Sequence, residues 1–138
     1  MNILFVEDSE TLANLFRVQL QMLGDHSLTT AGTKSAAMAA FKENEFDLVF
    51  VDMGLEGIQD RGLEVLSEIK MIAPEQRIGI LSSNDQREMV RASQQAEAEF
   101  YMIKPFTLEV LALVLDGNHE AIQDYQPEKI GEGRVIVF

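Results

Sequence analysis

Short, unbroken apolar runs recur along most of the chain, separated by longer mixed segments. The clearest run is Leu48–Val51, which has no polar position between its aliphatic and aromatic residues. A strand of this composition is typical of a parallel sheet that helices cover on both faces. Three further runs have the same character, and a fourth, more polar one indicates an edge strand: Ile3–Val6, Ile78–Leu81, Phe100–Ile103 and Ser27–Ala31.

Apolar residues recur at helical spacing between these runs. The five predicted helices carry Leu12, Leu15, Phe16, Leu20 and Leu23; Ala36, Ala37, Ala40 and Phe41; Leu63, Leu66 and Ile69; Met89, Val90 and Ala92; and Leu108, Leu111 and Leu115. Residues suited to capping helices precede four of them: Ser9 or Asp8, Thr33, Asp85 and Thr107. Strands that alternate with helices at short spacing predict an α/β fold, a parallel sheet with right-handed crossovers and helices on both faces.

The pattern weakens after Gly117. The last helix either ends at this glycine or continues through Ile122 to about Tyr125. Residues 126–133 have the composition of a loop, and Arg134–Phe138 has strand character. We therefore expect one domain over residues 1–117, followed by a C-terminal extension, residues 118–138, whose role the sequence does not indicate.

The composition is that of one acidic globular domain. The 138 residues include 11 basic and 23 acidic ones, for a net charge of −12. This charge disfavours binding to nucleic acid or to an anionic membrane and favours cationic partners such as divalent metal ions. The chain has no cysteine, no basic segment like that of a signal peptide, and no apolar stretch as long as a membrane span. We expect a cytoplasmic protein.

Polar side chains stand where the apolar strands end. Glu7 and Asp8 follow the first strand, Asp52 the third, Ser82 the fourth and Lys104 the fifth. Each alone has an ordinary explanation as a helix cap, a turn residue or a solvated charge. The carboxyl ends of parallel strands, however, lie at one edge of the sheet, where ligands of open α/β folds bind. Their joint placement favours a functional site.

The residue types at this edge point to phosphoryl chemistry. Two carboxylates ~5 Å apart repel by about 3 kcal/mol at an effective dielectric of about 20. A hard divalent cation would relieve this repulsion, and oxygen ligands with open positions suit Mg²⁺. A carboxylate can also attack phosphorus to give an aspartyl phosphate, while a metal ion and a lysine neutralise the phosphoryl oxygens.

Five motifs in the chain carry a family resemblance over about residues 2–116. They are Leu4-Phe5-Val6-Glu7-Asp8-Ser9, Leu48-Val49-Phe50-Val51-Asp52, Gly62-Leu63-Glu64-Val65-Leu66, Ile80-Leu81-Ser82-Ser83 and Phe100-Tyr101-Met102-Ile103-Lys104-Pro105-Phe106. In this order and spacing they resemble the receiver domain of two-component response regulators. The resemblance implies the flavodoxin-like receiver fold, a five-stranded parallel sheet of order 2-1-3-4-5.

The resemblance also implies a role for each site residue. Asp52 would accept the phosphoryl group, and Ser82 and Lys104 would contact it. Mg²⁺ would be bound by Asp8, Glu7, Asp52 and the backbone carbonyl of Gly54. Ser82 and the aromatic Tyr101 would form the switch, and a cis peptide before Pro105 would turn the chain so that Lys104 points at the site.

The function implied is that of a phosphorylation-controlled signalling switch. The chain would not be an enzyme, beyond self-phosphorylation and self-dephosphorylation. Its donor would be a phosphohistidine on a sensor histidine kinase or a phosphotransfer protein, and its downstream partner protein is unknown. Output would leave through the fourth helix, fifth strand and fifth helix, a face that a second copy could also use, and Leu113 and Val114 would give this face an apolar patch.

Alternatives and departures from the family pattern accompany this interpretation. The chain could be a receiver excised from a larger regulator or hybrid kinase, a flavin-binding electron carrier, or a Mg²⁺-dependent phosphatase, although Glu7-Asp8 would repel a flavin phosphate. The interval from Asp52 to Gly62 is longer than is usual in the family and lacks its Met-Pro pair, so we expect an unusual loop at 54–61. Glu97 stands where the family often has glycine, and a positive φ there would cost stability.

Overall fold

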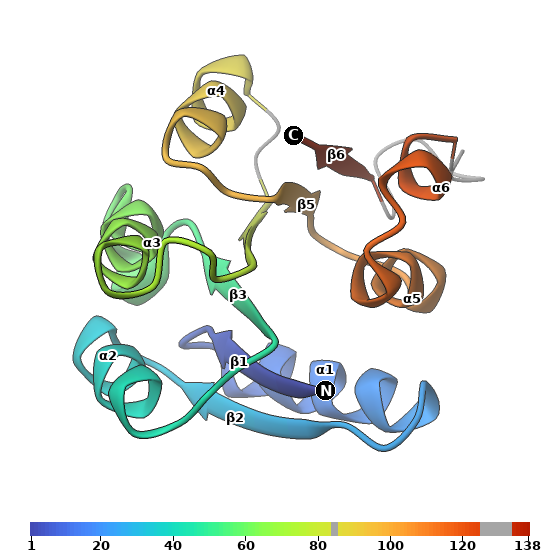
Figure 1. The fold of residues 1–138 in the computed structure, drawn as a ribbon, viewed down its shortest axis with the longest axis horizontal. Helices are drawn as coiled ribbons and strands as arrows, with labels where there is room; N and C mark the ends of the chain where they lie inside the picture. Colours follow the sequence, from blue (N-terminus) through green and yellow to red (C-terminus); the bar gives the residue numbers. More distant parts are fainter. Residues whose placement is uncertain (84–85, 125–133) are drawn as a thin grey trace.

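Strands and helices alternate along the chain in the computed structural model, which describes residues 1–83, 86–124 and 134–138 (Figure 1). The strands are β1 (Asn2–Val6), β2 (Ser27–Ala31), β3 (Leu48–Asp52), β4 (Ile78–Ser82), β5 (Phe100–Ile103) and β6 (Val135–Val137). The helices are α1 (Glu10–Met22), α2 (Lys34–Glu43), α3 (Arg61–Ile72), α4 (Arg87–Gln95), α5 (Leu108–Asp116) and α6 (His119–Asp124), with a 3₁₀ turn, η1 (Leu55–Gly57), before α3.

The six strands form a single sheet of order β2-β1-β3-β4-β5-β6. The first five run parallel, which confirms the predicted order 2-1-3-4-5. Strand β6 is an addition to that prediction, because it pairs antiparallel with the outer edge of β5. The C-terminal residues had strand character in the sequence, but their partner was not foreseen.

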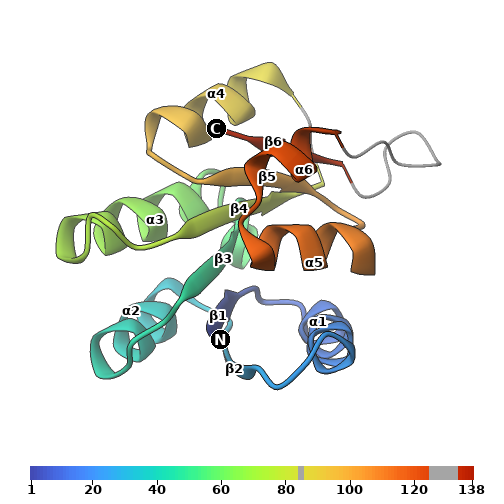
Figure 2. The ribbon, with the colours of Figure 1, turned by 45° about the vertical axis from the view of Figure 1, so that its right-hand side comes forward.

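Helices cover both faces of the sheet, as predicted. Figures 1 and 2 show α2, α3 and α4 on one face and α1, α5 and α6 on the other. Each face has its own core of buried side chains, and in the second one the rings of Phe5 and Phe16 stack with their centroids 4.1 Å apart. Three expectations about apolar positions are wrong: Leu15 is 49 % exposed on α1, Ala36 is exposed on α2, and Val114 is fully buried and gives the surface no apolar patch.

Side-chain caps start three helices as predicted. The hydroxyl oxygens of Ser9, Thr33 and Thr107 each accept a hydrogen bond from a backbone N–H in the first helical turn. The predicted cap Asp85 lies outside the described residues. At the other end of the domain, α5 stops at Gly117, whose φ of 73° ends the helix, and α6 follows as a separate helix.

The two departures from the family pattern have visible backbone consequences. Glu97, between α4 and β5, has a φ of 71°, a conformation in which a β-carbon is strained. The loop after β3 is built from positive φ values at Glu56, Gly57 and Asp60. The carboxylate of Glu56 accepts a hydrogen bond of 2.7 Å from the N–H of Lys34, so this loop is tied to the start of α2.

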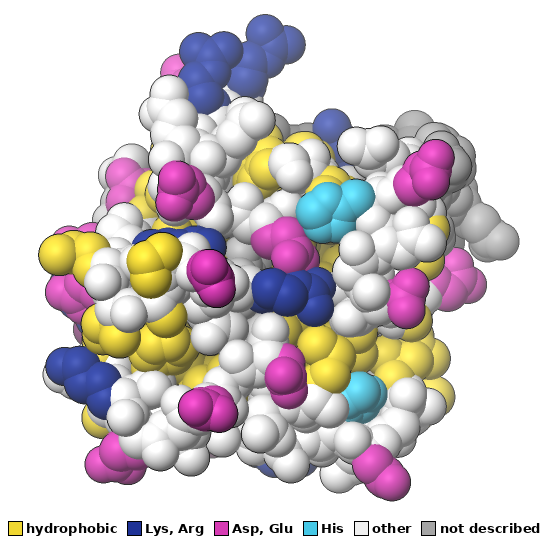
Figure 3. Space-filling view, viewed as in Figure 1, with side chains coloured by type: hydrophobic (Ala, Val, Ile, Leu, Met, Phe, Trp, Pro, Cys, Tyr) yellow, Lys and Arg dark blue, Asp and Glu magenta, His cyan; other side chains and the backbone are white. Residues whose placement is uncertain are grey.

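Charged side chains of both signs are exposed on the surface. Acidic side chains are scattered over the face seen in Figure 3, and basic side chains lie at its centre and left and project from the region of α4. None of the helices in the described ranges is long and apolar enough to cross a membrane.

Candidate functional site

The carboxyl ends of four parallel strands bring the predicted site residues together. Glu7 follows β1, Asp52 and Ser82 are the last residues of β3 and β4, and Lys104 follows β5. The side chains of Glu7, Asp52 and Ser82 are buried, and Asp8 beside them is exposed. Strand β3 is buried along its whole length, so the apolar run that predicted it carries Asp52 from the core directly to this edge.

Three carboxylates crowd together at this edge. One oxygen from each of Glu7, Asp8 and Asp52 lies within 4.8 Å of the others, which makes them a potential metal-binding group. At such a distance each pair of charges repels by about 3 kcal/mol at an effective dielectric of about 20. A fold that holds three carboxylates this close together favours a positively charged ligand between them.

Lys104 supplies a single ammonium group to the three carboxylates. Its Nζ donates hydrogen bonds to Asp52 Oδ1 at 2.9 Å and to Glu7 Oε1 at 3.1 Å. Burial lowers the pKa of this lysine, but the hydrogen bond and charge of Asp52, together with Glu7, raise it overall above its usual value. The Lys104–Pro105 peptide bond is cis, as predicted.

Glu7 has the least favourable environment for a charged carboxylate in the cluster. Burial, and then the neighbouring Asp52 carboxylate, raise its pKa to about 7, against the opposing effect of Lys104. Its second oxygen, Oε2, is buried and has no hydrogen-bond partner among the described residues. A buried carboxylate oxygen left in this state fits an oxygen ligand for a divalent cation, so the residues present suit Mg²⁺.

The loop after Asp52 is held by backbone contacts. The N–H of Gly57 donates to the Gly54 carbonyl at 2.9 Å, so this predicted metal ligand already accepts one hydrogen bond and keeps one lone pair. The sequence placed Gly62 in a family motif but indicated no role for it at the site. A β-carbon at Gly62 would overlap the backbone carbonyl of Asp52, so α3 can lie directly against the site only with glycine there.

The two predicted switch residues lie on neighbouring strands but at different depths. Ser82 ends β4 at the acidic cluster. Tyr101, in β5, is fully buried in the core on the α2–α4 side and lies opposite Ile136 of β6. A role for these two residues in switching stays a prediction. The predicted output face is altered, because β6 now lies along the β5 edge.

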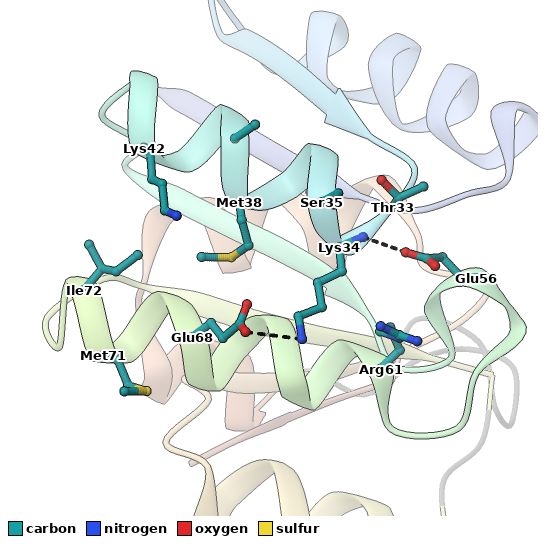
Figure 4. A pocket seen from close by; sticks show the side chains of 11 residues that line it. Thr33, Lys34, Ser35, Met38, Lys42, Glu56, Arg61, Glu68, Met71 and Ile72 are labelled. Carbon is teal, nitrogen blue, oxygen red and sulfur yellow. Dashed lines mark hydrogen bonds and ion pairs between the residues drawn. The ribbon is translucent and has the colours of Figure 1, made fainter.

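A large open groove lies elsewhere on the molecule. It has a volume of about 1010 Å³ and runs between α2 and α3, where Lys34 and Glu68 form an ion pair of 3.2 Å (Figure 4). None of the acidic-cluster residues lines it. The candidate site is therefore the acidic edge at the strand ends and not the groove between α2 and α3.

A family-model comparison agrees with the geometry of this edge. The model described as the response regulator receiver domain matches residues 3–116. The chain is 31 % identical to the chemotaxis protein CheY of Bacillus subtilis, over 75 % of this chain and 85 % of that protein. It is 29 % identical to the chemotaxis protein CheY-3 of Vibrio cholerae, over 88 % and 94 %.

Longer proteins also match. The alginate biosynthesis transcriptional regulatory protein AlgB of Pseudomonas aeruginosa is 32 % identical over 95 % of this chain, and the match spans only 30 % of that protein. Among solved structures, NtrX from Brucella abortus superposes with a TM-score of 0.77 at 31 % identity, covering 87 % of this chain and 27 % of that one. The chain thus spans most of the length of the two chemotaxis proteins but only about a third or less of the length of these longer relatives.

Proposed function

Because the chain belongs to the response regulator receiver domain family, we propose that it is a phosphorylation-controlled switch in which Asp52 accepts the phosphoryl group. The observation that carries the proposal is the setting of Asp52. This buried carboxylate ends β3, lies 2.9 Å from the ammonium of Lys104, and has two further carboxylates beside it. Such a setting combines a nucleophilic oxygen with groups that neutralise phosphoryl charge.

The reaction would move a phosphoryl group between two side chains. The P–N bond of a phosphohistidine on a sensor histidine kinase or phosphotransfer protein breaks, and a P–O bond to Asp52 forms. Lys104 would follow the new negative charge, and the Ser82 hydroxyl would donate to a phosphoryl oxygen. Glu7, Asp8, Asp52 and the Gly54 carbonyl would hold Mg²⁺, which supplies further neutralisation of the phosphoryl oxygens.

Output would pass through contacts with another protein. The relatives include chemotaxis proteins of about this length and transcriptional regulators several times longer. Receiver domains thus occur among them both as nearly the whole protein and as one part of a longer regulator. The net charge of −12 disfavours direct contact of this domain with nucleic acid. We propose that a partner protein reads the state of Asp52 through Ser82 and Tyr101.

Labelling with a small phosphodonor tests the proposal. Incubation with acetyl phosphate and Mg²⁺ should add one phosphoryl group, detected as an intact-mass increase, and a chelator should prevent it. Asp52→Ala should abolish the increase, whereas Asp116→Asn, which removes an exposed carboxylate at the end of α5, should not. Full labelling of Asp52→Ala would refute the assignment. Continuous turnover of p-nitrophenyl phosphate would instead favour the phosphatase alternative.

A further inference from the structure

Strand β6 occupies the edge of β5 that would otherwise be open to a partner. In their antiparallel pairing Phe100 lies opposite Val137, Tyr101 opposite Ile136, and Met102 opposite Val135. Backbone hydrogen bonds flank these pairs: the Ile103 N–H donates to the Arg134 carbonyl at 2.9 Å, and the Phe138 N–H donates to the Glu99 carbonyl at 3.1 Å. The backbone groups of β5 on this side are therefore hydrogen-bonded to β6 and the residues that flank it.

The side chains of β6 join both cores of the domain. Ile136 and Phe138 pack against the core on the α2–α4 side, and Val135 and Val137 pack against the core that contains α5 and Ile122 of α6. Helix α6 also contacts β6 and α5, and Figure 2 shows it beside them. The described part of the extension is thus packed into the domain, although the sequence does not indicate its role.

One peptide unit connects this strand to the acidic cluster. The N–H of Ile103 donates to the backbone carbonyl of Arg134, just before β6. The next residue, Lys104, binds Asp52 and Glu7 through its ammonium group. The backbone N–H of Lys104 also donates to the Ser82 carbonyl at 2.8 Å. The end of β5 is therefore held by β6 on one side and by the site on the other.

We propose that β6 is an intramolecular brake on the switch. Its docking stabilises the position of β5 in which Lys104 binds unmodified Asp52, and it closes the β5 edge to a partner. This inference rests on the proposed phosphorylation of Asp52. A phosphoryl group on Asp52 offers Lys104 new oxygen atoms to bind, which would shift the end of β5. Any such shift disturbs the pairing of β5 with β6 at Ile103. Phosphorylation of Asp52 therefore disfavours the docked state of β6. By linkage, undocking of β6 favours phosphorylation to the same extent.

The strand is suited to being released. It has three residues, a single neighbouring strand, and side chains that remain partly exposed, which are features of a segment of low local stability. Its departure would expose a row of backbone donors and acceptors along β5, flanked by apolar side chains. Such an edge fits an extended apolar segment of a partner protein, added as a strand in the place of β6.

A disulfide across the β5–β6 pair tests the brake within one molecule. The flanking hydrogen bonds make Met102 and Val135 a non-hydrogen-bonded pair, whose Cα atoms in antiparallel sheets are about 4.5 Å apart, within reach of a disulfide. The chain has no cysteine of its own. In Met102→Cys/Val135→Cys, the ratio of phosphorylated to unmodified protein that acetyl phosphate and Mg²⁺ establish should be at least about fivefold lower in the oxidised form than in the reduced form, the lower end of usual couplings between linked sites.

The wild type, measured with and without reductant, controls for the reducing agent. Equal loading of the oxidised and reduced forms would overturn the brake and leave the proposed function standing. Failure of the wild type itself to load Asp52 would instead refute the proposed function. The two failures are therefore distinguishable.

A release variant covers the case in which the disulfide protein does not fold. Ile136→Asp places a charge against the α2–α4 core and should raise the phosphorylated fraction and speed hydrogen exchange at the Ile103 amide. Met71→Asp, at a position on α3 that is 84 % exposed, is the matched control and should change neither. Faster exchange at Ile103 without a larger phosphorylated fraction would show that β6 is uncoupled from Asp52 and would overturn the proposal.

Discussion

Charged side chains cluster at both ends of the central strands, partly buried at the amino ends and more deeply buried at the carboxyl ends, and the two clusters differ in their balance of charge. At the amino ends of β4 and β5, Arg77 binds Glu99 through two hydrogen bonds of 2.8 Å and also donates to the Val114 carbonyl at 3.0 Å. At the carboxyl ends, Lys104 faces three carboxylates, and Glu7 Oε2 has no partner among the described residues. The first cluster is balanced in charge, and the second is not.

The difference separates a structural pair from a site. The hydrogen bonds to Glu99 raise the pKa of Arg77, so this pair stabilises the charged form of the guanidinium group. Burial and Asp52 raise the pKa of Glu7 to about 7, so the acidic cluster opposes the charged form of a carboxylate. A pair of this first kind holds α5 to the sheet, whereas unrelieved charge of the second kind is typical of functional sites. Four experiments probe this contrast.

The largest effect is expected at the balanced pair. Arg77→Ala leaves the Glu99 carboxylate without its partner and the Val114 carbonyl without its donor, and should lower the free energy of unfolding by about 3 kcal/mol. Denaturant titration measures this loss. Arg87→Ala, at an exposed position on α4, should cost little. Phosphoryl loading of folded Arg77→Ala should match the wild type; a loss of loading would show that the two clusters are not separate.

The pH dependence of stability probes the unbalanced cluster. In metal-free protein the folded state holds a proton on Glu7 up to about pH 7, because its pKa is raised there, whereas the unfolded chain releases it near the ordinary pKa of 4.5. The folded state therefore binds more protons in this window, and the free energy of unfolding should fall as the pH rises. A full shift at 1.36 kcal/mol per unit would give about 3 kcal/mol, and we expect about 2 because solvent reaches part of the cluster.

Glu7→Gln should remove this decline between pH 4.5 and pH 7, since it leaves no carboxyl group to titrate there. Glu75→Gln, at an exposed position after α3, should retain it. Thermal or denaturant unfolding in a chelating buffer at several pH values provides the measurement. An identical decline in Glu7→Gln would assign the effect to another group.

Removing the exposed carboxylate should separate stability from metal binding. Asp8→Asn relieves repulsion without breaking a bond to Lys104, so the metal-free protein should be slightly more stable, by under about 1 kcal/mol. Its Mg²⁺ affinity should fall by at least about tenfold, since even the loss of an outer-sphere partner has costs of that order. Calorimetric titration with Mg²⁺ checks this, with Asp116→Asn as control. Unchanged affinity would remove Asp8 from the ligand set.

The smallest effect is expected at Glu97, two residues before Glu99. Its φ of 71° is strained for a residue with a β-carbon, so Glu97→Gly should raise the free energy of unfolding by about 0.5 to 1 kcal/mol. The same substitution at Glu88, in the first turn of α4, should lower it by about 0.5 to 1 kcal/mol, because glycine disfavours the helix and an acidic side chain is favourable near its amino end. Phosphoryl loading should be unchanged in both. Destabilisation by Glu97→Gly would show that the turn has other requirements.

Much of the fold and the site was readable from the sequence because it rests on local patterns. Unbroken apolar runs predict buried parallel strands, and a polar residue that ends such a run lies where the carboxyl ends of the strands meet. Asp52, Ser82 and Lys104 could therefore be named together from their positions alone. The caps at Ser9, Thr33 and Thr107 were equally local, since each oxygen reaches an N–H within its own helical turn.

The rest depended on contacts between residues distant in the chain. The sequence indicates no role for Gly62 at the site, because the need for glycine arises only where α3 packs against the Asp52 carbonyl. The pairing of Glu56 with the start of α2 and the orphaned oxygen of Glu7 likewise depend on how separate segments pack. Most of all, the strand character of Arg134–Phe138 did not name its partner, because any open sheet edge offers the same backbone groups. Only the tertiary structure placed it on β5, where its side chains complete the two cores and its first carbonyl binds the residue before Lys104.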